Sequence, residues 1–410
     1  MKILQINKFF FIKGGVERYF FDLSELLAGK GHQVIPWSVR HDNNFPYPEQ
    51  NDFAQFIDFS KNEGFFKEIA KGWKIIWNRD AGKKLEKVIQ KHQPDIAHVH
   101  NIFTHLSPSV ISVLKKHDIP VAMTLHDYKF FCPNYTFFTN GETCFACLKK
   151  KNYYSCLIKK CVKNSYFKSL AGCLEGEWQK FLKVSQKIDV FLSPSSYLRR
   201  KAVEWGIPKE KIFTLPNFIF KEKEVVAGRS EKNYILYFGR LNQEKGVNLL
   251  VESFSEIFKN FPYWKLKIVG EGPEEERLKK MVSGREEIEI LGRQNSREMK
   301  KTIAGANLVV VPSLWPENFP YAVLESFCLA RPVIAAKIGG LPELIKDGKT
   351  GILFKPGDKG DLKEKIVYAI NNLSRMKELG VFAQKEVLRK YNPDKHYQKL
   401  IKIYEGIKRN

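Results

Sequence analysis

The sequence lacks any hydrophobic run of about 20 residues, the length that a membrane-spanning helix needs. It has no low-complexity tract and no internal repeat of fixed period, so wholesale disorder is not expected. The apolar stretch near the start is short and broken by Gln5, Asn7 and Lys8, and no small-residue cleavage site follows it. We therefore expect no signal peptide, and a cytoplasmic protein that at most rests peripherally on the inner face of the cytoplasmic membrane.

Acidic residues are scarce relative to basic ones. The chain has 45 Asp and Glu against 68 Lys and Arg, which gives a net charge of +23. Such an excess indicates an anionic partner, whether nucleic acid, phosphorylated metabolites or an anionic membrane surface. The alternative interpretation is a lysine-rich proteome with no functional meaning.

Cysteine is also scarce, and its distribution is uneven. Six of the seven cysteines lie between Cys132 and Cys173, and Cys328 stands alone. In a reducing compartment such a cluster favours metal binding over disulfides. A Cys-x-x-Cys pair with two more thiolates nearby predicts a structural zinc site, and unliganded cysteines are the alternative. The preferred ligands are Cys132, Cys144, Cys147 and Cys161, with Cys156 as a substitute.

What the sequence does contain is short apolar strands alternating with helical segments, twice over. A chain of 410 residues suits two or three domains, and this alternation predicts an α/β fold with two Rossmann-like, doubly wound parallel sheets facing a cleft. We expect an N-terminal domain over 1–218 with an insert at about 130–175, a polar linker over 219–231 and a C-terminal domain over 232–390. From the pattern alone, the last helix within 391–410 could belong to either domain.

Two cations follow the first strand of the second domain. Arg240 comes directly after the strand Tyr234–Phe238, and Lys245 stands at the entry to the next helix. Ligands of such sheets bind beyond the carboxyl ends of the strands, and two cations there can hold a diphosphate. The alternative is a solvated surface pair.

Two carboxylates follow a later strand. Glu317 lies in the loop after Val309–Pro312, and Glu325 lies one turn into the next helix, whose start suits Pro320. Glu325 could accept hydrogen bonds from a ribose, and Glu317 could meet sugar hydroxyls. The alternative is that both glutamates are ordinary surface residues. The apolar neighbours of Glu325 in the sequence argue against this alternative, because they indicate a largely buried helix in which a glutamate needs a partner.

Motifs over nearly the whole chain carry a family resemblance. The most specific run is Ser313–Glu325, which continues through Arg331-Pro-Val-Ile to Gly339-Gly-Leu-Pro-Glu343. Other matching motifs are Phe238–Lys245, Val269–Pro273, Leu291-Gly292, Gly14-Gly15, His98-Val-His100-Asn101, Leu125-His126-Asp127 and Ser193-Pro-Ser195. The sequence resembles the retaining family 4 (group 1) glycosyltransferases, in a subset with a cysteine-containing insert.

The resemblance implies a GT-B fold, with the last helix crossing back onto the N-terminal domain, and a set of roles. It implies that Arg240 and Lys245 bind a donor diphosphate, that Glu325 holds the ribose, and that Glu317 lies near the donor sugar. His126 would hydrogen-bond the sugar, and no catalytic metal would be needed. The other implied donor-binding residues are Gly14, Gly15, Gly270, Gly272, Gly292, Arg293, Asn318, Phe319, Pro320 and Tyr321. Asp127 is expected to be an orienting or structural residue and not a nucleophile.

Two basic, aromatic segments indicate contact with a membrane. Seven lysines and no acid lie between Lys149 and Leu174, interleaved with aromatic residues. Over Phe65–Trp77, apolar residues share one helical face opposite lysines, a pattern typical of an interfacial helix. An ordinary core-packing helix is the alternative for this second segment.

The function implied is transfer of a sugar from a nucleotide-diphosphate sugar, UDP before GDP, to a glycan or lipid-linked acceptor in cell-surface polysaccharide biosynthesis. A nucleotide-sugar epimerase or a carbohydrate phosphorylase on the same fold is an alternative, although no lysine is singled out for pyridoxal phosphate. A basic, zinc-containing nucleic-acid-binding protein is an alternative of another class. A nucleic-acid-binding protein would have no role for the Glu317–Glu325 spacing, so we expect no nucleic-acid partner.

Overall fold

The structure is a computed structural model that describes residues 1–58, 72–221 and 233–408. The chain divides into two compact units. The first unit comprises Met1–Phe137, Phe145–Asn217 and Asp394–Asn410, and the second comprises Phe138–Cys144 and Phe218–Pro393.

The first unit is built on a sheet of six parallel strands in the order β10-β9-β6-β5-β1-β2. The strands β5, β6 and β9 are buried along their whole length, as expected for a parallel sheet covered by helices on both faces. The strands are β1 (Lys2–Ile6), β2 (Gln33–Trp37), β5 (Ile96–Val99), β6 (Val121–Thr124), β9 (Val190–Ser193) and β10 (Ile212–Thr214).

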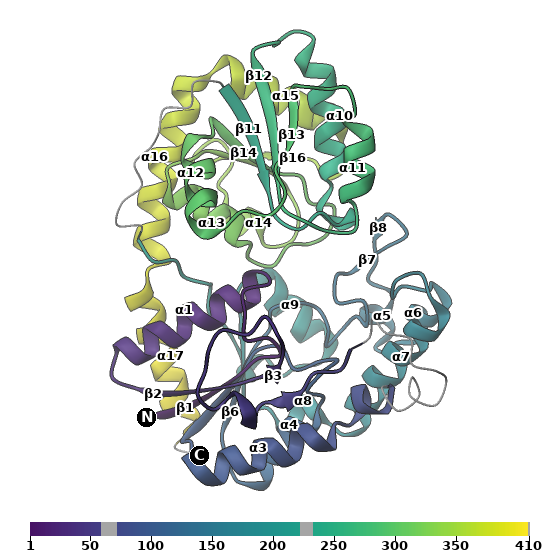
Figure 1. The fold of residues 1–410 in the computed structure, drawn as a ribbon, viewed down its shortest axis with the longest axis vertical. Helices are drawn as coiled ribbons and strands as arrows, with labels where there is room; N and C mark the ends of the chain where they lie inside the picture. Colours follow the sequence, from purple (N-terminus) through teal and green to yellow (C-terminus); the bar gives the residue numbers. More distant parts are fainter. Residues whose placement is uncertain (59–71, 222–232, 409–410) are drawn as a thin grey trace. The chain divides into compact units, whose positions relative to one another are not determined.

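Helices from both ends of the chain cover this sheet. In Figure 1, α1 and α17 run close together, and the Tyr19 hydroxyl of α1 lies 3.0 Å from Nε2 of His396 on α17. Tyr404 of α17 also reaches the sheet, with its hydroxyl 2.5 Å from Nδ1 of His98 on β5. The helices are α1 (Gly15–Gly29), α3 (Arg79–His92), α4 (Ser109–Lys116), α8 (Val184–Lys187), α9 (Ser196–Trp205) and α17 (Pro393–Lys408).

An insert follows β6 and is mostly helical. A short hairpin of β7 (Phe138–Thr139) and β8 (Glu142–Thr143) belongs to the segment grouped with the second unit. The helices α5 (Ala146–Lys150), α6 (Tyr154–Ile158) and α7 (Tyr166–Phe181) belong to the first unit. A two-stranded pair of β3 (Val39–Arg40) and β4 (Ala54–Gln55) lies elsewhere in the first unit.

The second unit repeats the plan, with six parallel strands in the order β13-β12-β11-β14-β15-β16. Its core joins the central strands to the apolar faces of α10 (Val247–Phe258) and α15 (Lys359–Asn371), and includes Ile235, Phe254 and Ile366. The strands are β11 (Asn233–Phe238), β12 (Trp264–Val269), β13 (Ile288–Ile290), β14 (Leu308–Val311), β15 (Val333–Ala336) and β16 (Ile352–Phe354).

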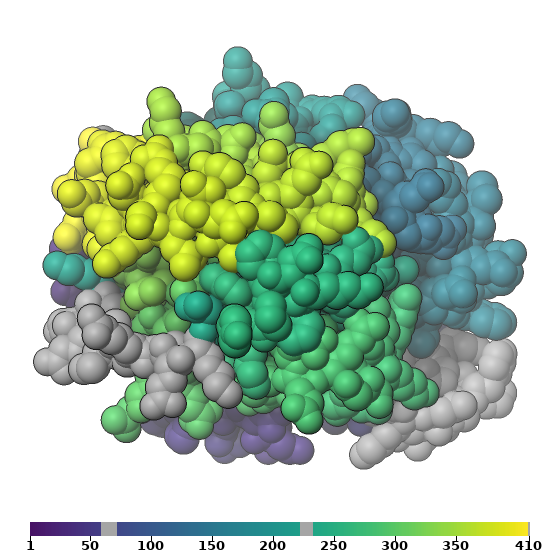
Figure 2. All heavy atoms as spheres, turned by 90° about the horizontal axis from the view of Figure 1, so that it is seen from above, coloured from purple at the N-terminus to yellow at the C-terminus, as the bar shows by residue number. Residues whose placement is uncertain are grey.

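Helices cover both faces of the second sheet. Figure 1 shows α10 and α11 on one face and α12 and α13 on the other, as a right-handed crossover rule requires when the strand order reverses at β11. Figure 2 shows the second unit from above, where the residues of α15 lie beside those of α10. The helices are α10 (Val247–Phe258), α11 (Glu275–Met281), α12 (Ser296–Gly305), α13 (Tyr321–Cys328), α14 (Leu341–Leu344), α15 (Lys359–Asn371) and α16 (Leu373–Lys390).

The predicted fold class, α/β with two doubly wound parallel sheets, is confirmed. Two other predictions lie partly outside the described residues. The predicted interfacial helix over Phe65–Trp77 is described only from residue 72, and residues 72–76 are helical. The predicted linker over 219–231 is described only as far as residue 221. The structure groups 138–144 with the second unit, whereas the sequence placed these residues in the N-terminal domain. Among the described helices, none has both the length and the apolar character needed to cross a membrane.

Candidate functional site

In the second unit, the loops that leave neighbouring strands are bonded to one another at the carboxyl edge of the sheet. The backbone N–H of Leu241, after β11, donates to the carbonyl of Glu271, after β12, at 2.9 Å. Gly270 donates in turn to the carbonyl of Gly292, after β13, at 2.8 Å. Three loops that the sequence predicts to bind the donor therefore form one continuous edge.

Two glycines permit the close approach of these loops. Gly270 has φ +142, and a Cβ there would overlap the carbonyl oxygen of Gly239. Gly339 has φ +63, and a Cβ there would overlap the backbone of Glu317. Gly340 donates to the Glu317 carbonyl at 2.6 Å, so this glycine pair holds the Glu317 loop in place.

Lys245 and Glu317 meet at the centre of this edge. Lys245 Nζ lies 2.7 Å from Glu317 Oε1, and the Ser313 hydroxyl donates to the same oxygen at 2.7 Å. The side chains of Lys245 and Glu317 are only 16% and 6% exposed. Burial by itself would raise the pKa of Glu317, but Lys245 and Ser313 outweigh it and hold that pKa below its ordinary value. The result is a buried, ionised carboxylate, with Lys245 also 4.9 Å from the centroid of the Trp315 ring.

Arg240 and Glu325 stand nearer to solvent. Arg240 is exposed, and among the residues that the structure describes no carboxylate forms an ion pair with it. Glu325 is half-buried on α13. That helix begins at Tyr321, with Pro320 at the N-cap position in extended geometry, so Pro320 precedes the first turn and does not lie in it as the sequence suggested.

The remaining predicted donor-binding residues of this unit lie on the same edge. Asn318 and Phe319 are buried beside Glu317, and the Phe319 ring lies 5.2 Å from that of Tyr391 in an edge-to-face arrangement. Arg293 forms an exposed ion pair with Glu271 at 3.1 Å. Gly272 is packed against the Leu241 carbonyl, where a Cβ would overlap it.

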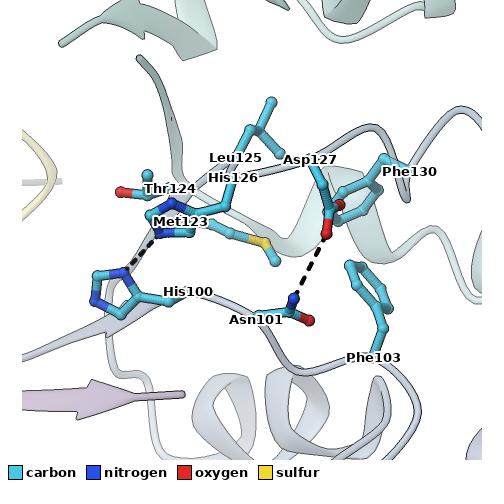
Figure 3. Close-up of a pocket in the computed structure, with 9 residues that line it drawn as sticks. All are labelled: His100, Asn101, Phe103, Met123, Thr124, Leu125, His126, Asp127 and Phe130. Carbon is cyan, nitrogen blue, oxygen red and sulfur yellow. Dashed lines mark hydrogen bonds between the residues drawn. The ribbon is translucent and has the colours of Figure 1, made fainter. Parts of the chain in front are cut away.

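In the first unit, His126 ends a buried chain of hydrogen bonds. Its Nε2 lies 3.0 Å from Nδ1 of His100, whose Nε2 lies 2.9 Å from Oε1 of Gln5, and Figure 3 shows the two imidazoles facing each other. Because the Gln5 oxygen can only accept, His100 donates to it from Nε2, and a neutral His100 then accepts at Nδ1. His126 therefore donates to His100 from Nε2, and Nδ1 is the acceptor nitrogen of the neutral His126 ring. Burial lowers the pKa of His126 to about 3, so its ring is neutral at pH 7.

A small pocket opens beside this chain, with an empty volume of about 230 Å³ that includes its mouth. His126 and Asp127 line it with Asn101, whose amide donates to Asp127 at 3.5 Å (Figure 3). Burial lowers the pKa of the nearby Lys8, although Asp127 and Glu17 oppose this shift. Asp127 also accepts a hydrogen bond from the backbone N–H of Lys129 at 2.9 Å.

Gly14 and Gly15 begin α1 in the same unit. Gly14 is in extended geometry, and a Cβ there would meet only ordinary contact with the Glu17 side chain at 3.9 Å. Its neighbours in the chain therefore do not require a glycine at this position. If a glycine is needed at position 14, the reason would be the close approach of a bound ligand to the backbone.

The cysteine insert gathers thiols without forming a recognisable metal site. A hydrogen bond between Cys156 and Cys161 raises the pKa of Cys156, as do burial and the proximity of Cys132 and Cys147. Cys156, the substitute ligand of the sequence prediction, therefore lies close to Cys132, Cys147 and Cys161. Within 1–58, 72–221 and 233–408, no group of three or more His, Cys, Asp or Glu side chains is arranged to hold a metal ion. Zinc binding by Cys132, Cys144, Cys147 and Cys161 stays a prediction.

The structure thus places the predicted residues in two clusters, one on each sheet. Lys245 and Glu317 are in direct contact, which the sequence did not predict. Sequence reasoning also missed the partners of this pair, Ser313 and Trp315, and the buried Lys8 of the first unit. Ser313 and Trp315 belong to the quoted run before Glu317, so a search of that run for hydrogen-bond donors could have found them.

Two domains, each built on a doubly wound parallel sheet, are the architecture of the GT-B fold. The glycosyltransferase family 4 profile matches residues 13–223, and the profile of the glycosyl transferases group 1 matches residues 219–386. The chain therefore belongs to the family 4, group 1 glycosyltransferases.

Individual relatives are distant. The chain is 28% identical over 253 residues to an uncharacterized glycosyltransferase of Methanocaldococcus jannaschii, an alignment covering 61% of this chain and 65% of that protein. It is 24% identical over 320 residues to the sulfoquinovosyl transferase of Arabidopsis thaliana, covering 73% of this chain and 54% of that protein. It thus spans less than two thirds of either relative.

Solved structures share the fold over the whole length. The Anabaena protein HepE, crystallised in complex with UDP and glucose, superposes with a TM-score of 0.68 at 16% identity and covers 99% of each chain. At this identity, the similarity establishes the fold alone.

Proposed function

We propose that the protein is a retaining glycosyltransferase that moves a sugar from a nucleotide-diphosphate sugar to a glycan or lipid-linked acceptor. UDP is the preferred nucleotide and GDP the next. The proposed setting is the synthesis of a cell-surface polysaccharide, on the cytoplasmic side of the membrane.

One observation carries the proposal: the buried contact of Lys245 with Glu317 and Ser313 at the carboxyl edge of the second sheet. A buried ion pair is costly unless its geometry and further hydrogen bonds offset the loss of water. Here Glu317 has two donors and Lys245 an aromatic neighbour, which favours a positioned, reactive arrangement over a chance surface pair.

The donor would be held by charge and by backbone. Arg240, exposed and without a carboxylate partner among the described residues, and Lys245 would bind the diphosphate and stabilise it as it leaves. Glu317 would fix the direction of the Lys245 ammonium and meet a hydroxyl of the sugar. Glu325, half-buried on α13, would accept hydrogen bonds from the ribose. The UDP complex of HepE supports UDP as the first choice.

His126 would contribute a neutral acceptor. This imidazole, which also contacts His100, would hydrogen-bond a sugar hydroxyl, as the family resemblance implies. Its low pKa keeps this imidazole neutral at pH 7.

The configuration of the transferred sugar would be retained because the acceptor hydroxyl would attack the sugar from the same face that the phosphate leaves. The leaving phosphate would help to deprotonate that hydroxyl. No nucleophilic carboxylate is then required. Arg240 and Lys245 would supply the positive charge that a divalent metal provides in other transferases, so the proposed reaction needs no catalytic metal.

A thermal-shift panel of nucleotide sugars tests the donor site. One nucleotide-diphosphate sugar, at about 100 times its Kd, should raise the melting temperature by roughly 3 °C, because ligand binding stabilises the folded state. Lys245→Ala should abolish the shift, whereas Lys279→Ala, on the exposed surface of α11, should leave it unchanged. The proposal fails if no nucleotide sugar stabilises the protein.

Release of the nucleotide distinguishes a transferase from an epimerase. We expect turnover of the stabilising donor to rise when a saccharide acceptor is added. Conversion of the donor to an isomeric nucleotide sugar without any acceptor would instead assign the site to an epimerase.

A further inference from the structure

Helix α7 of the insert turns its apolar side chains toward solvent. Phe167 and Phe181 are 86% and 73% exposed, and Trp178 is 38% exposed. The exposed apolar residues recur every three or four positions and therefore share one face of the helix. We call this the α7 apolar face, and its residues are Tyr166, Phe167, Leu170, Leu174, Trp178 and Phe181.

The opposite face of α7 is made of small or polar residues and is buried. Ser169, Gly172 and Cys173 lie on it, and Gly176 packs so closely under Tyr153 that a Cβ there would overlap the ring. Larger side chains do not fit on this side, so the helix has no room to rotate its apolar face inward. The outward position of the aromatic residues is thus a consequence of the packing.

The acidic residues of α7 do not accompany the apolar face. Glu175 is 2% exposed and forms an ion pair with Lys129 at 2.8 Å. Glu177 accepts from the backbone N–H of Tyr153 at 3.0 Å and lies 3.6 Å from Lys180. Each carboxylate therefore has a lysine partner, and Glu175 is buried.

Lysines lie beside the first turns of α7 instead. All seven between Lys149 and Leu174 lie in a stretch without an acid, and Lys163 and Lys168 are exposed. Lys160 places its ammonium 4.2 Å from the centroid of the Tyr166 ring. Aromatic side chains bordered by lysines are the composition of a surface that lies in the interface of an anionic bilayer.

We propose that the α7 apolar face docks on an anionic lipid bilayer, with its aromatic rings at the boundary of the headgroups and its lysines against the lipid phosphates. A second copy of the chain fits less well, because a two-fold contact through this face would bring the two sets of lysines together. The docking surface goes beyond the proposed transfer reaction and does not depend on it.

Co-sedimentation with lipid vesicles tests the proposal. The full chain should sediment with vesicles of phosphatidylcholine and phosphatidylglycerol. It should bind at least about 10-fold more weakly to phosphatidylcholine alone, or in 0.5 M salt, because part of the affinity is electrostatic. Equal binding to both kinds of vesicle would overturn it.

Variants assign the binding to this face. The double substitution Phe167→Ser and Phe181→Ser should weaken sedimentation by about 10-fold or more, because it removes the most exposed rings. Lys163→Gln with Lys168→Gln should weaken it in the same direction. The control is Tyr263→Ser, which removes a side chain that is also 86% exposed but lies in the second unit, and it should bind as the parent does.

Two further readings separate the outcomes. The variants alter exposed side chains, so their melting temperatures should equal that of the parent. With a water-soluble acceptor, the variants should still release nucleotide even if they no longer bind vesicles. Unchanged vesicle binding by the Phe167 and Phe181 variant would overturn the proposal. So would a dimer of the parent that this variant abolishes, because the face would then belong to a second copy.

Discussion

At the scale of single residues, the central feature is a glutamate that stays ionised although it is buried. Glu317 is 5% exposed, and its pKa is nevertheless below the ordinary value because Lys245 and Ser313 outweigh the effect of burial. Neither residue is unusual by itself. The contact gives each a defined position and charge, which is what stabilising a leaving phosphate requires.

Replacing Glu317 by Gln should therefore lower kcat by about 100-fold, since a positioned electrostatic contact at a reacting group has that order of effect. Steady-state release of nucleotide in the presence of acceptor measures it. Glu289→Gln, which alters a surface ion pair with Lys265 on the outer strands, is the matched control and should keep full activity. A Glu317→Gln enzyme within threefold of the parent would contradict the assigned role.

At the scale of elements, the insert after β6 shows how packing sets the direction of a helix. Gly172 and Gly176 allow α7 to pack close to its neighbours. Four cysteines of the first unit lie together in this region: Cys147, Cys156 and Cys173 are buried, and Cys161 packs against them. A thiol cluster in a small, irregular segment has the composition of a metal-stabilised loop, although the described residues are not arranged as one.

Elemental analysis of the purified protein tests the zinc prediction. We expect about one zinc ion per chain, lost in Cys147→Ser together with a lower melting temperature, because metal binding to such a segment contributes to its folding. Cys328→Ser alters a buried cysteine of the second unit and should retain the metal. A metal-free parent that melts at the same temperature with and without a chelator would disprove the prediction.

At the scale of the whole molecule, a group of buried, neutral histidines links the stability of the first unit to pH. Burial lowers the pKa values of His98 and His100 well below the ordinary value, and those of His126 and His396 to about 3. His396 is 4% exposed, with Nδ1 2.9 Å from the Pro216 carbonyl, so it is neutral in the folded chain.

Because the folded pKa of His396 lies below the unfolded value of about 6.5, the unfolded chain binds more protons between these values. Stability is then fully present above about pH 6.5 and falls as the pH falls toward 3, by about 2 kcal/mol for this one residue at pH 5. The melting temperature should accordingly drop between pH 7.5 and pH 5.

His396→Asn should make that drop smaller, and a comparison of the variant with the parent at both pH values measures the difference. The variant at pH 7.5 controls for its direct effect on packing. A parent that melts equally at pH 5 and pH 7.5, or a variant with the same drop as the parent, would contradict this account.

Much of the fold was predictable because its signals are local. Apolar runs marked the buried strands, and the strand predicted at Tyr234–Phe238 is β11, Asn233–Phe238. The insert was less predictable, because the apolar residues of α7 would normally indicate a buried face. Their exposure depends on Tyr153 and Gly176, which are distant in sequence and meet only through packing.

By itself, the sequence determined the two parallel sheets, the family and the loops that carry Arg240, Lys245, Glu317 and Glu325, because strand periodicity and loop motifs are written along the chain. Only the tertiary structure decided that Lys245 and Glu317, 72 residues apart, form one ion pair. It also decided that His126 ends a chain of neutral imidazoles and that α7 turns its aromatic face outward. The physical reason is common to all three: each depends on which strands and helices become neighbours, and therefore on contacts that no local pattern contains.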